Sequence, residues 1–142
     1  MDATAAYAIS ASGLRAQRLR MDVIAANLAN AQSTRTPTGG PYRRHEVVFE
    51  AAPGGGTFDD ALNASNPGVR VARIVEDQNP PQLVFQPGHP DADARGYVAM
   101  PNVNVVTEMV DMMSATRAYE ANVAALNATK RLLEAALEIG RS

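Results

Sequence analysis

The chain has 142 residues, 46% of them apolar, which is enough for one domain with a core. Its formal net charge is −2, from 13 basic and 15 acidic residues without a block of like charges, so it has no basic surface suited to nucleic acid or an anionic membrane. Cysteine is absent, which excludes disulfides and thiolate metal sites.

The amino terminus lacks the features of a secretory signal peptide. It does not start with basic residues, and its longest apolar run is shorter than such a peptide needs. No stretch approaches the roughly 20 apolar residues of a membrane-spanning helix. We therefore expect that, if the protein leaves the cytosol, it uses a route without a cleaved signal.

Residues 3–31 are expected to form one helix, because they include no proline and a single glycine. Apolar residues lie on two faces of this helix, and such a helix is usually buried on both. On one face, apolar residues recur every seven positions, and we expect this face to contact a partner helix: Tyr7, Leu14, Met21 and Leu28.

Residues 32–102 hold all nine prolines and eight of the ten glycines, and predict a small β-rich insert. Residues 44–50, 69–76 and 82–86 have the pattern of strands, and residues 53–68 that of an exposed loop. A meander of three or four strands has little core of its own. We expect it to pack on the helices or on neighbouring subunits.

Residues 104–139 predict one long helix, capped by Asn104 and ended by Gly140. Apolar residues recur along it in alternating steps of four and three, the pattern of a coiled-coil seam. We expect this seam to face the first helix in an antiparallel pair, through Val105, Met109, Met112, Tyr119, Val123, Leu126, Leu133 and Leu137.

The opposite side of this helix carries a stripe of mostly small residues: Ala118, Ala121, Ala125, Ala128, Leu132, Ala135 and Ile139. The two helices would be roughly 42 and 54 Å long, too long for a globule whose radius of gyration is about 14 Å. We therefore expect the stripe to be an intersubunit interface. The alternative is a bundle within one chain, but the insert does not supply the third long helix that it requires.

The predicted fold is thus mainly α with a small β-rich insert. Residues 1–31 and 103–142 would form the paired helices, as an antiparallel coiled coil, and residues 32–102 the central β meander and loops.

The best candidate for a metal site is the group of His89, Asp91 and Asp93. Prolines before and after the histidine keep this segment extended, so its side chains do not converge on an ion, and no second cluster completes a ligand set. Turn formation is the favoured interpretation. Motifs for a nucleophile, a phosphate-binding loop or a zinc protease are also absent. We expect no cofactor, no metal and no catalysis; a small metal-dependent enzyme at these residues is the disfavoured alternative.

Several motifs resemble those of bacterial flagellar axial proteins, which build the rod and hook. They include Ser12-Gly13-Leu14, residues 24–31 (IAANLANA) and residues 114–122 (SATRAYEAN). Residues 87–93 (PGHPDAD), followed by GYV at 96–98 and MPNV at 100–103, resemble the proximal-rod FlgC family more specifically. The family motif residues are Asn27, Leu28, Asn30, Gly88, His89, Pro90, Asp91, Asp93, Gly96 and Tyr97.

This resemblance implies a structural subunit of the flagellar basal-body rod. Such a subunit would leave the cell through the flagellar type III export apparatus and assemble in the periplasm. It would pack helically with other rod subunits, with further copies of itself and with the adaptor that joins rod to membrane ring, and would transmit torque from motor to hook. A distal-rod or hook subunit is the alternative, against which residues 88–103 argue.

Overall fold

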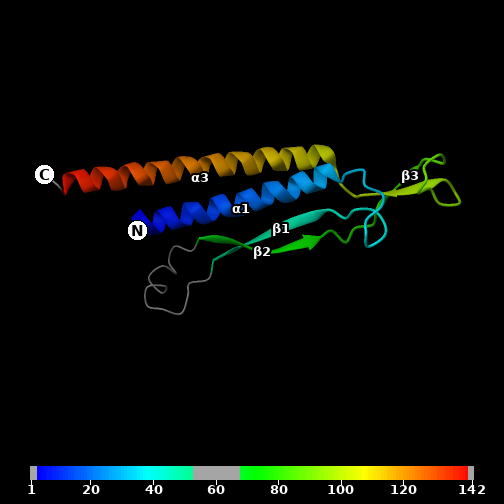
Figure 1. Ribbon diagram of the computed structural model, residues 1–142, viewed down its shortest axis with the longest axis horizontal. Helices are drawn as coiled ribbons and strands as arrows, with labels where there is room; N and C mark the ends of the chain where they lie inside the picture. The colour runs from blue at the N-terminus through cyan, green and yellow to red at the C-terminus, as the bar shows by residue number, and fades with distance from the viewer. Residues whose placement is uncertain (1–2, 53–67, 141–142) are drawn as a thin grey trace.

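The computed structural model describes residues 3–52 and 68–140. Two helices, α1 (Ala3–Ala29) and α3 (Val105–Ile139), lie side by side along its longest axis (Figure 1). They run in opposite directions, and α3 extends past the amino end of α1 (Figure 1). The two long terminal helices and the β-rich insert that the sequence predicts are therefore present.

The helix α3 begins where the sequence predicts a cap. The Asn104 side chain accepts hydrogen bonds from the backbone N–H groups of Val106 and Thr107, at 3.0 and 3.1 Å. These bonds satisfy two of the donors that a first helical turn leaves without partners. At the other end, the Gly140 N–H donates to the carbonyl oxygen of Ala136 at 3.1 Å, and the helix stops.

The insert forms two separate antiparallel sheets, and the prediction of a single meander is wrong. β1 (His45–Ala51) pairs with β2 (Val69–Glu76), and β3 (Gln82–Phe85) pairs with β4 (Tyr97–Met100). Pro80-Pro81 separates β2 from β3, and prolines have no N–H group with which to continue a ladder. The loop predicted at 53–68 lies, apart from Gly68, outside the described residues.

The helix α1 is the middle layer of the molecule. α3 covers one side of it and the β1–β2 sheet covers the other, while the β3–β4 hairpin projects beyond the end of the helix pair (Figure 1). This arrangement explains the two apolar faces of α1. The outer side of α3, by contrast, has no covering layer among the described residues.

The core is thin and made largely of small side chains. The buried apolar residues of the described chain are Ala16, Ile24, Val98, Val103 and Ala115. Two of the most completely buried side chains are polar, Asn27 and Glu108. The specificity of packing between the layers must therefore depend on these polar groups as well as on apolar burial.

Candidate assembly interface

The row of α3 side chains that faces α1 differs from the predicted one. Glu108 and Ala115 are buried against the rest of the chain, and Asn122 lies against Gly13. Val105 and Met109, predicted to be in the seam, are instead 46% and 56% exposed. The prediction is wrong at these two positions because the charged Glu108 occupies the inward position that heptad spacing had given to its apolar neighbours.

The predicted seam is also wrong at Tyr7 and Leu137, which are exposed. A strict seven-residue repeat drifts about 20° per heptad around a straight helix, so the row that starts at Leu28 moves away from α3 by Tyr7. Leu137 is close to the end of α3 at Ile139, and α3 extends past the amino end of α1 (Figure 1). The remaining predicted seam residues are half-buried: Leu14, Met21, Leu28, Met112, Tyr119, Val123, Leu126 and Leu133.

A polar junction of Asn27, Arg44 and Glu108 joins α1, the start of β1 and α3. The Asn27 Nδ2 donates to Glu108 Oε2 at 3.0 Å and to the His45 carbonyl oxygen at 2.8 Å. Its Oδ1 accepts from the His45 N–H and from the Tyr42 hydroxyl, both at 2.9 Å. All four hydrogen-bonding positions of the amide are therefore filled.

The Glu108 carboxylate is paired as well as buried. The Arg44 Nε lies 2.6 Å from Glu108 Oε1, and the same guanidinium reaches Glu46 at 3.5 Å and Asp111 at 3.8 Å. Partial burial opposes the charge of Arg44, but the hydrogen bond to Glu108 and the surrounding carboxylates raise its pKa above the ordinary value. Burial, together with the charge of Glu108, also raises the pKa of Tyr42. The charged pair of the junction thus lies beside a neutral phenol, which bonds to Asn27.

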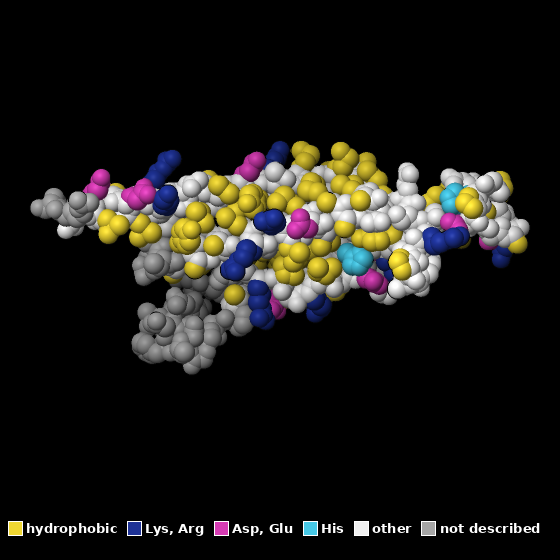
Figure 2. Space-filling model, viewed as in Figure 1, with side chains coloured by type: hydrophobic (Ala, Val, Ile, Leu, Met, Phe, Trp, Pro, Cys, Tyr) yellow, Lys and Arg dark blue, Asp and Glu magenta, His cyan; other side chains and the backbone are white. Residues whose placement is uncertain are grey.

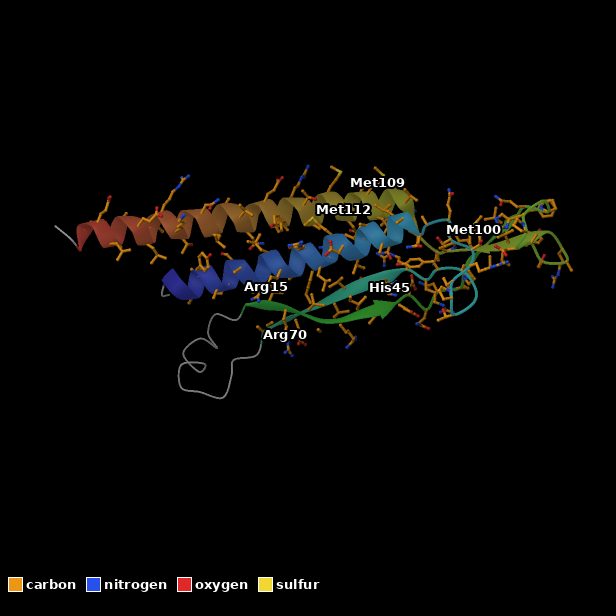
Figure 3. All side chains as sticks on the ribbon, viewed as in Figure 1. Arg15, His45, Arg70, Met100, Met109 and Met112 are labelled. Atoms are coloured by element: carbon orange, nitrogen blue, oxygen red, sulfur yellow. The ribbon has the colours of Figure 1, made fainter. Side chains whose placement is uncertain are left out.

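The first turns of α3 carry an apolar patch on the side away from α1. Figure 2 shows apolar side chains gathered along this edge of the molecule, and Figure 3 places Met109 there and Met112 nearer to α1. Val106 and Val110 are 70% and 59% exposed. This amino-terminal patch consists of Val105, Val106, Met109, Val110 and Met113.

The Ala stripe continues the outward face toward the end of α3. Ala118 is half-buried, and the rest of the predicted stripe is exposed: Ala121, Ala125, Ala128, Leu132, Ala135 and Ile139. Sequence reasoning missed the amino-terminal patch, because valine and methionine at heptad spacing normally indicate a core. The missed signal was a second row in steps of four and three that contains Glu108, Ala115 and Asn122.

Comparison with known proteins identifies the family. Residues 8–35 match the family described as "Flagella basal body rod protein", and residues 94–139 match "Flagellar basal body rod FlgEFG protein C-terminal". The flagellar basal-body rod protein FlgC of Escherichia coli is 49% identical, over 95% of this chain and 96% of its own. The FlgC proteins of Borreliella burgdorferi and Bacillus subtilis are 48% and 47% identical, over 92% and 94% of this chain and 93% and 95% of theirs. The chain belongs to the FlgC family of flagellar basal-body rod proteins.

The amino-terminal family motif ends the helix α1 and connects it to β1. Asn27 belongs to the polar junction, and the half-buried Leu28 follows it. Asn30 donates from Nδ2 to the Ala26 carbonyl oxygen at 2.9 Å, and its Oδ1 accepts from the Ser33 hydroxyl at 3.0 Å. The motif therefore ends α1 and ties it to the start of β1.

The second FlgC motif shapes the loop between β3 and β4. Asp91 accepts hydrogen bonds from the Thr34 hydroxyl at 2.8 Å and from the Arg35 guanidinium. These two hydrogen bonds lower the pKa of Asp91, and the bond from Thr34 has the larger effect. The His89 Nδ1 accepts from the Asp91 N–H at 3.1 Å. Asp91 thus anchors the loop to the segment that follows α1, and Gly88 and Pro90 occupy turn positions beside it.

The end of the same motif forms a tight turn into β4. The Asp93 Oδ1 accepts from the N–H groups of Arg95 and Tyr97, at 2.8 and 2.9 Å. Gly96 has φ +83, and a Cβ there would lie 2.9 Å from the Phe85 ring. Phe85 and Tyr97 then pack edge to face, with ring centroids 5.3 Å apart. Only glycine suits position 96.

The predicted candidate for metal binding does not form a ligand cage. Among residues 3–52 and 68–140, no three His, Asp or Glu side chains come together in a way that could hold an ion. The Asp91 and Asp93 carboxylates are engaged with separate partners. Within the same residues, no helix combines the length and apolar content needed to cross a membrane.

Proposed function

We propose that this protein is a structural subunit of the proximal rod of the bacterial flagellum and that it has no catalytic activity. The single observation that carries the proposal is the outward face of α3, formed by the amino-terminal patch and the Ala stripe. Its large apolar side chains are exposed along much of a 35-residue helix. Exposed apolar patches of this kind typically mark protein–protein interfaces.

The occupants that we propose are the terminal helices of other axial subunits, including further copies of this chain. α1 is already covered on both sides within the chain, whereas the outer side of α3 is left for neighbours. Small residues such as Ala121, Ala125 and Ala128 allow another helix to approach closely. When such contacts join subunits head to tail without closing into a ring, they generate a helical tube.

A rod built in this way would transmit torque from the motor to the hook through many parallel contacts along its helices. We propose that α1 and α3 act as one coiled-coil unit in the wall of the rod, with residues 32–102 as an insert between the two helices in the sequence. The resemblance to axial proteins supports export by the flagellar type III apparatus without a cleaved signal, and assembly in the periplasm. It also supports other rod subunits and the adaptor to the membrane ring as partners.

A pair of substitutions on α3 tests the assembly role. Ala125→Glu introduces a charge into the Ala stripe, while Ala125→Ser keeps a small, uncharged side chain at the same exposed position. In the free monomer, glutamate costs only a few tenths of a kcal/mol relative to alanine in a helix. An unpaired charge between subunits costs several kcal/mol at each interface.

We therefore expect both variants to keep the circular dichroism spectrum of the wild-type protein and to be exported. Cells with Ala125→Ser should build rods and swim, and cells with Ala125→Glu should do neither. Normal swimming with Ala125→Glu would show that the stripe is not a close interface.

A further inference from the structure

Two rows of side chains on α3 compete to face α1. The row predicted from heptad spacing includes the apolar Val105 and Met109, whereas the observed row includes Glu108, Ala115 and Asn122. The two rows differ by a rotation of roughly 50° about the helix axis, half of the angle between successive residues. Burial of apolar area alone favours the predicted row, because valine and methionine bury more of it than alanine. Another interaction must select the observed row.

We propose that the polar junction fixes the rotation of α3 and thereby keeps the amino-terminal patch outward. The Glu108 side chain is 1% exposed, and its two oxygens meet Arg44 Nε at 2.6 Å and Asn27 Nδ2 at 3.0 Å. Neither donor belongs to α3, since Asn27 lies in α1 and Arg44 directly precedes β1. A rotation that buried Val105 and Met109 would carry the carboxylate away from both donors.

The Asn27 side chain, which donates to Glu108, is itself held in place by hydrogen bonds. Asn27 pairs with both the N–H and the carbonyl oxygen of His45, so α1 and β1 fix the direction of its Nδ2 group. The Tyr42 hydroxyl bonds to the Asn27 Oδ1 and lies 2.9 Å from the His45 Nδ1. A buried polar residue that sets helix register at a cost in stability is well attested in coiled coils. Here a buried polar residue sets the rotation of α3 about its own axis.

The functional consequence concerns the face that α3 presents. With Glu108 inward, Val106, Val110 and Met113 are exposed in the free chain. That these residues then meet neighbouring subunits rests on the proposed function. The control of rotation by the junction does not, and it can be measured on the unassembled chain.

Thiol labelling reports the rotation directly. The chain contains no cysteine, so a single introduced thiol is the only site for a maleimide. Met109→Cys places a thiol in the amino-terminal patch, and Ala115→Cys places one in the buried row, where alanine is 0% exposed. With the junction intact, we expect rapid labelling at position 109 and slow labelling at position 115.

The decisive change is Arg44→Met, which removes the guanidinium but keeps an apolar stem of similar length. Glu108 is then a buried carboxylate without a charge partner, a strongly destabilised arrangement. We expect α3 to rotate so that this carboxylate reaches water. Labelling at position 109 should slow by about tenfold or more, and labelling at position 115 should accelerate by a similar factor, because an unpaired buried charge shifts an equilibrium at least that far.

Two controls separate rotation from general loss of structure. Arg44→Met combined with Glu108→Leu leaves no charge to expel and places a large apolar side chain in the buried row. Apolar burial then favours this row as well, so the wild-type labelling pattern should return. Glu46→Gln removes only an exposed partner of Arg44 and should leave both rates unchanged. Unchanged labelling with Arg44→Met would overturn the proposal, and so would rapid labelling at both positions, because the helices would then have separated instead of rotating.

The assay also distinguishes this inference from the proposed function. If labelling behaves as expected but Val110→Glu cells build normal rods, the junction controls rotation and the outward patch is not an assembly face. If labelling fails while Val110→Glu blocks assembly, the assembly face stands and the role given to the junction is wrong.

Discussion

Gly13 of α1 lies directly against the side chain of Asn122 on α3. A Cβ at position 13 would be 2.7 Å from the Asn122 Oδ1, and the Asn122 Nδ2 donates to the Ala118 carbonyl oxygen at 2.8 Å, which holds the amide in place. Glycine inside a helix costs about 1 kcal/mol relative to alanine. The close approach of the two helices accounts for glycine at this position, whereas local helix preference does not.

Gly13→Ala should therefore destabilise the protein, although it improves helix propensity. Excess volume in a packed interface usually costs about 1–3 kcal/mol, and the gain in helix propensity offsets about 1 kcal/mol of this. The expected net loss is therefore up to about 2 kcal/mol in the free energy of unfolding, as measured by urea denaturation. Gly13→Ala combined with Asn122→Ala removes the clash and should recover most of the loss. A single variant more stable than the wild-type protein would show that the helices are not tightly packed here.

Val110→Glu tests the amino-terminal patch in the same way that Ala125→Glu tests the Ala stripe. Val110 is 59% exposed, so the substitution should change the melting temperature of the purified monomer little. Between subunits, the added charge should prevent close packing and cost several kcal/mol at each contact. We expect export without rod assembly, scored by electron microscopy of basal bodies, with the apolar substitution Val110→Ile as the control. Intact rods would show that the patch faces solvent in the assembly.

The Asp91 anchor should weaken in acid. The hydrogen bonds from Thr34 and Arg35 lower the pKa of Asp91 in the folded chain. A lowered carboxyl pKa contributes stability above the unfolded pKa, near 4, and this contribution disappears as the pH falls through the folded pKa.

An NMR titration should show the Asp91 carboxyl signal changing below its ordinary range, together with the signals of Thr34. In Asp91→Asn, the Thr34 signals should lose this transition. Titration of Asp91 at or above the ordinary value would mean that the anchor is not formed in solution.

His89→Ala should leave the metal content of the protein at zero. The His89 Nδ1 accepts a hydrogen bond from the backbone N–H of Asp91, so the imidazole helps to form a turn. The Asp91 and Asp93 carboxylates accept hydrogen bonds from other groups. Mass spectrometric analysis of metals in purified wild-type and variant protein checks this. A stoichiometric ion in the wild-type protein that is lost in the variant would restore the metal-site interpretation.

The sequence predicted the helices better than their contacts. Asn104 and the absence of proline define α3, since capping and helix breaking are local effects. The rotation of α3 depends on Glu108, whose donors Asn27 and Arg44 lie 81 and 64 residues away, so the apolar pattern around Glu108 indicated the wrong row. In the same way, the anchor between Asp91 and Thr34 spans 57 residues and leaves no periodic signal.

Prediction of the strands was also limited to segments with a clear local pattern. β1 and β2 are seven and eight residues long and were predicted within one residue at each end, whereas the four-residue β4 was not predicted as a separate strand. Pairing with β3 determines that segment, and such pairing is not visible in the local sequence.

Electron cryomicroscopy of an intact basal body can show whether neighbouring subunits cover the outward face of α3. We expect density for this chain in the rod, with the side chains of Val106, Val110 and Ala125 in van der Waals contact with helices of adjacent subunits. We also expect Glu108 to stay inward against Arg44. If these three residues instead face solvent or the central channel of the rod, the outward face of α3 is not an assembly interface.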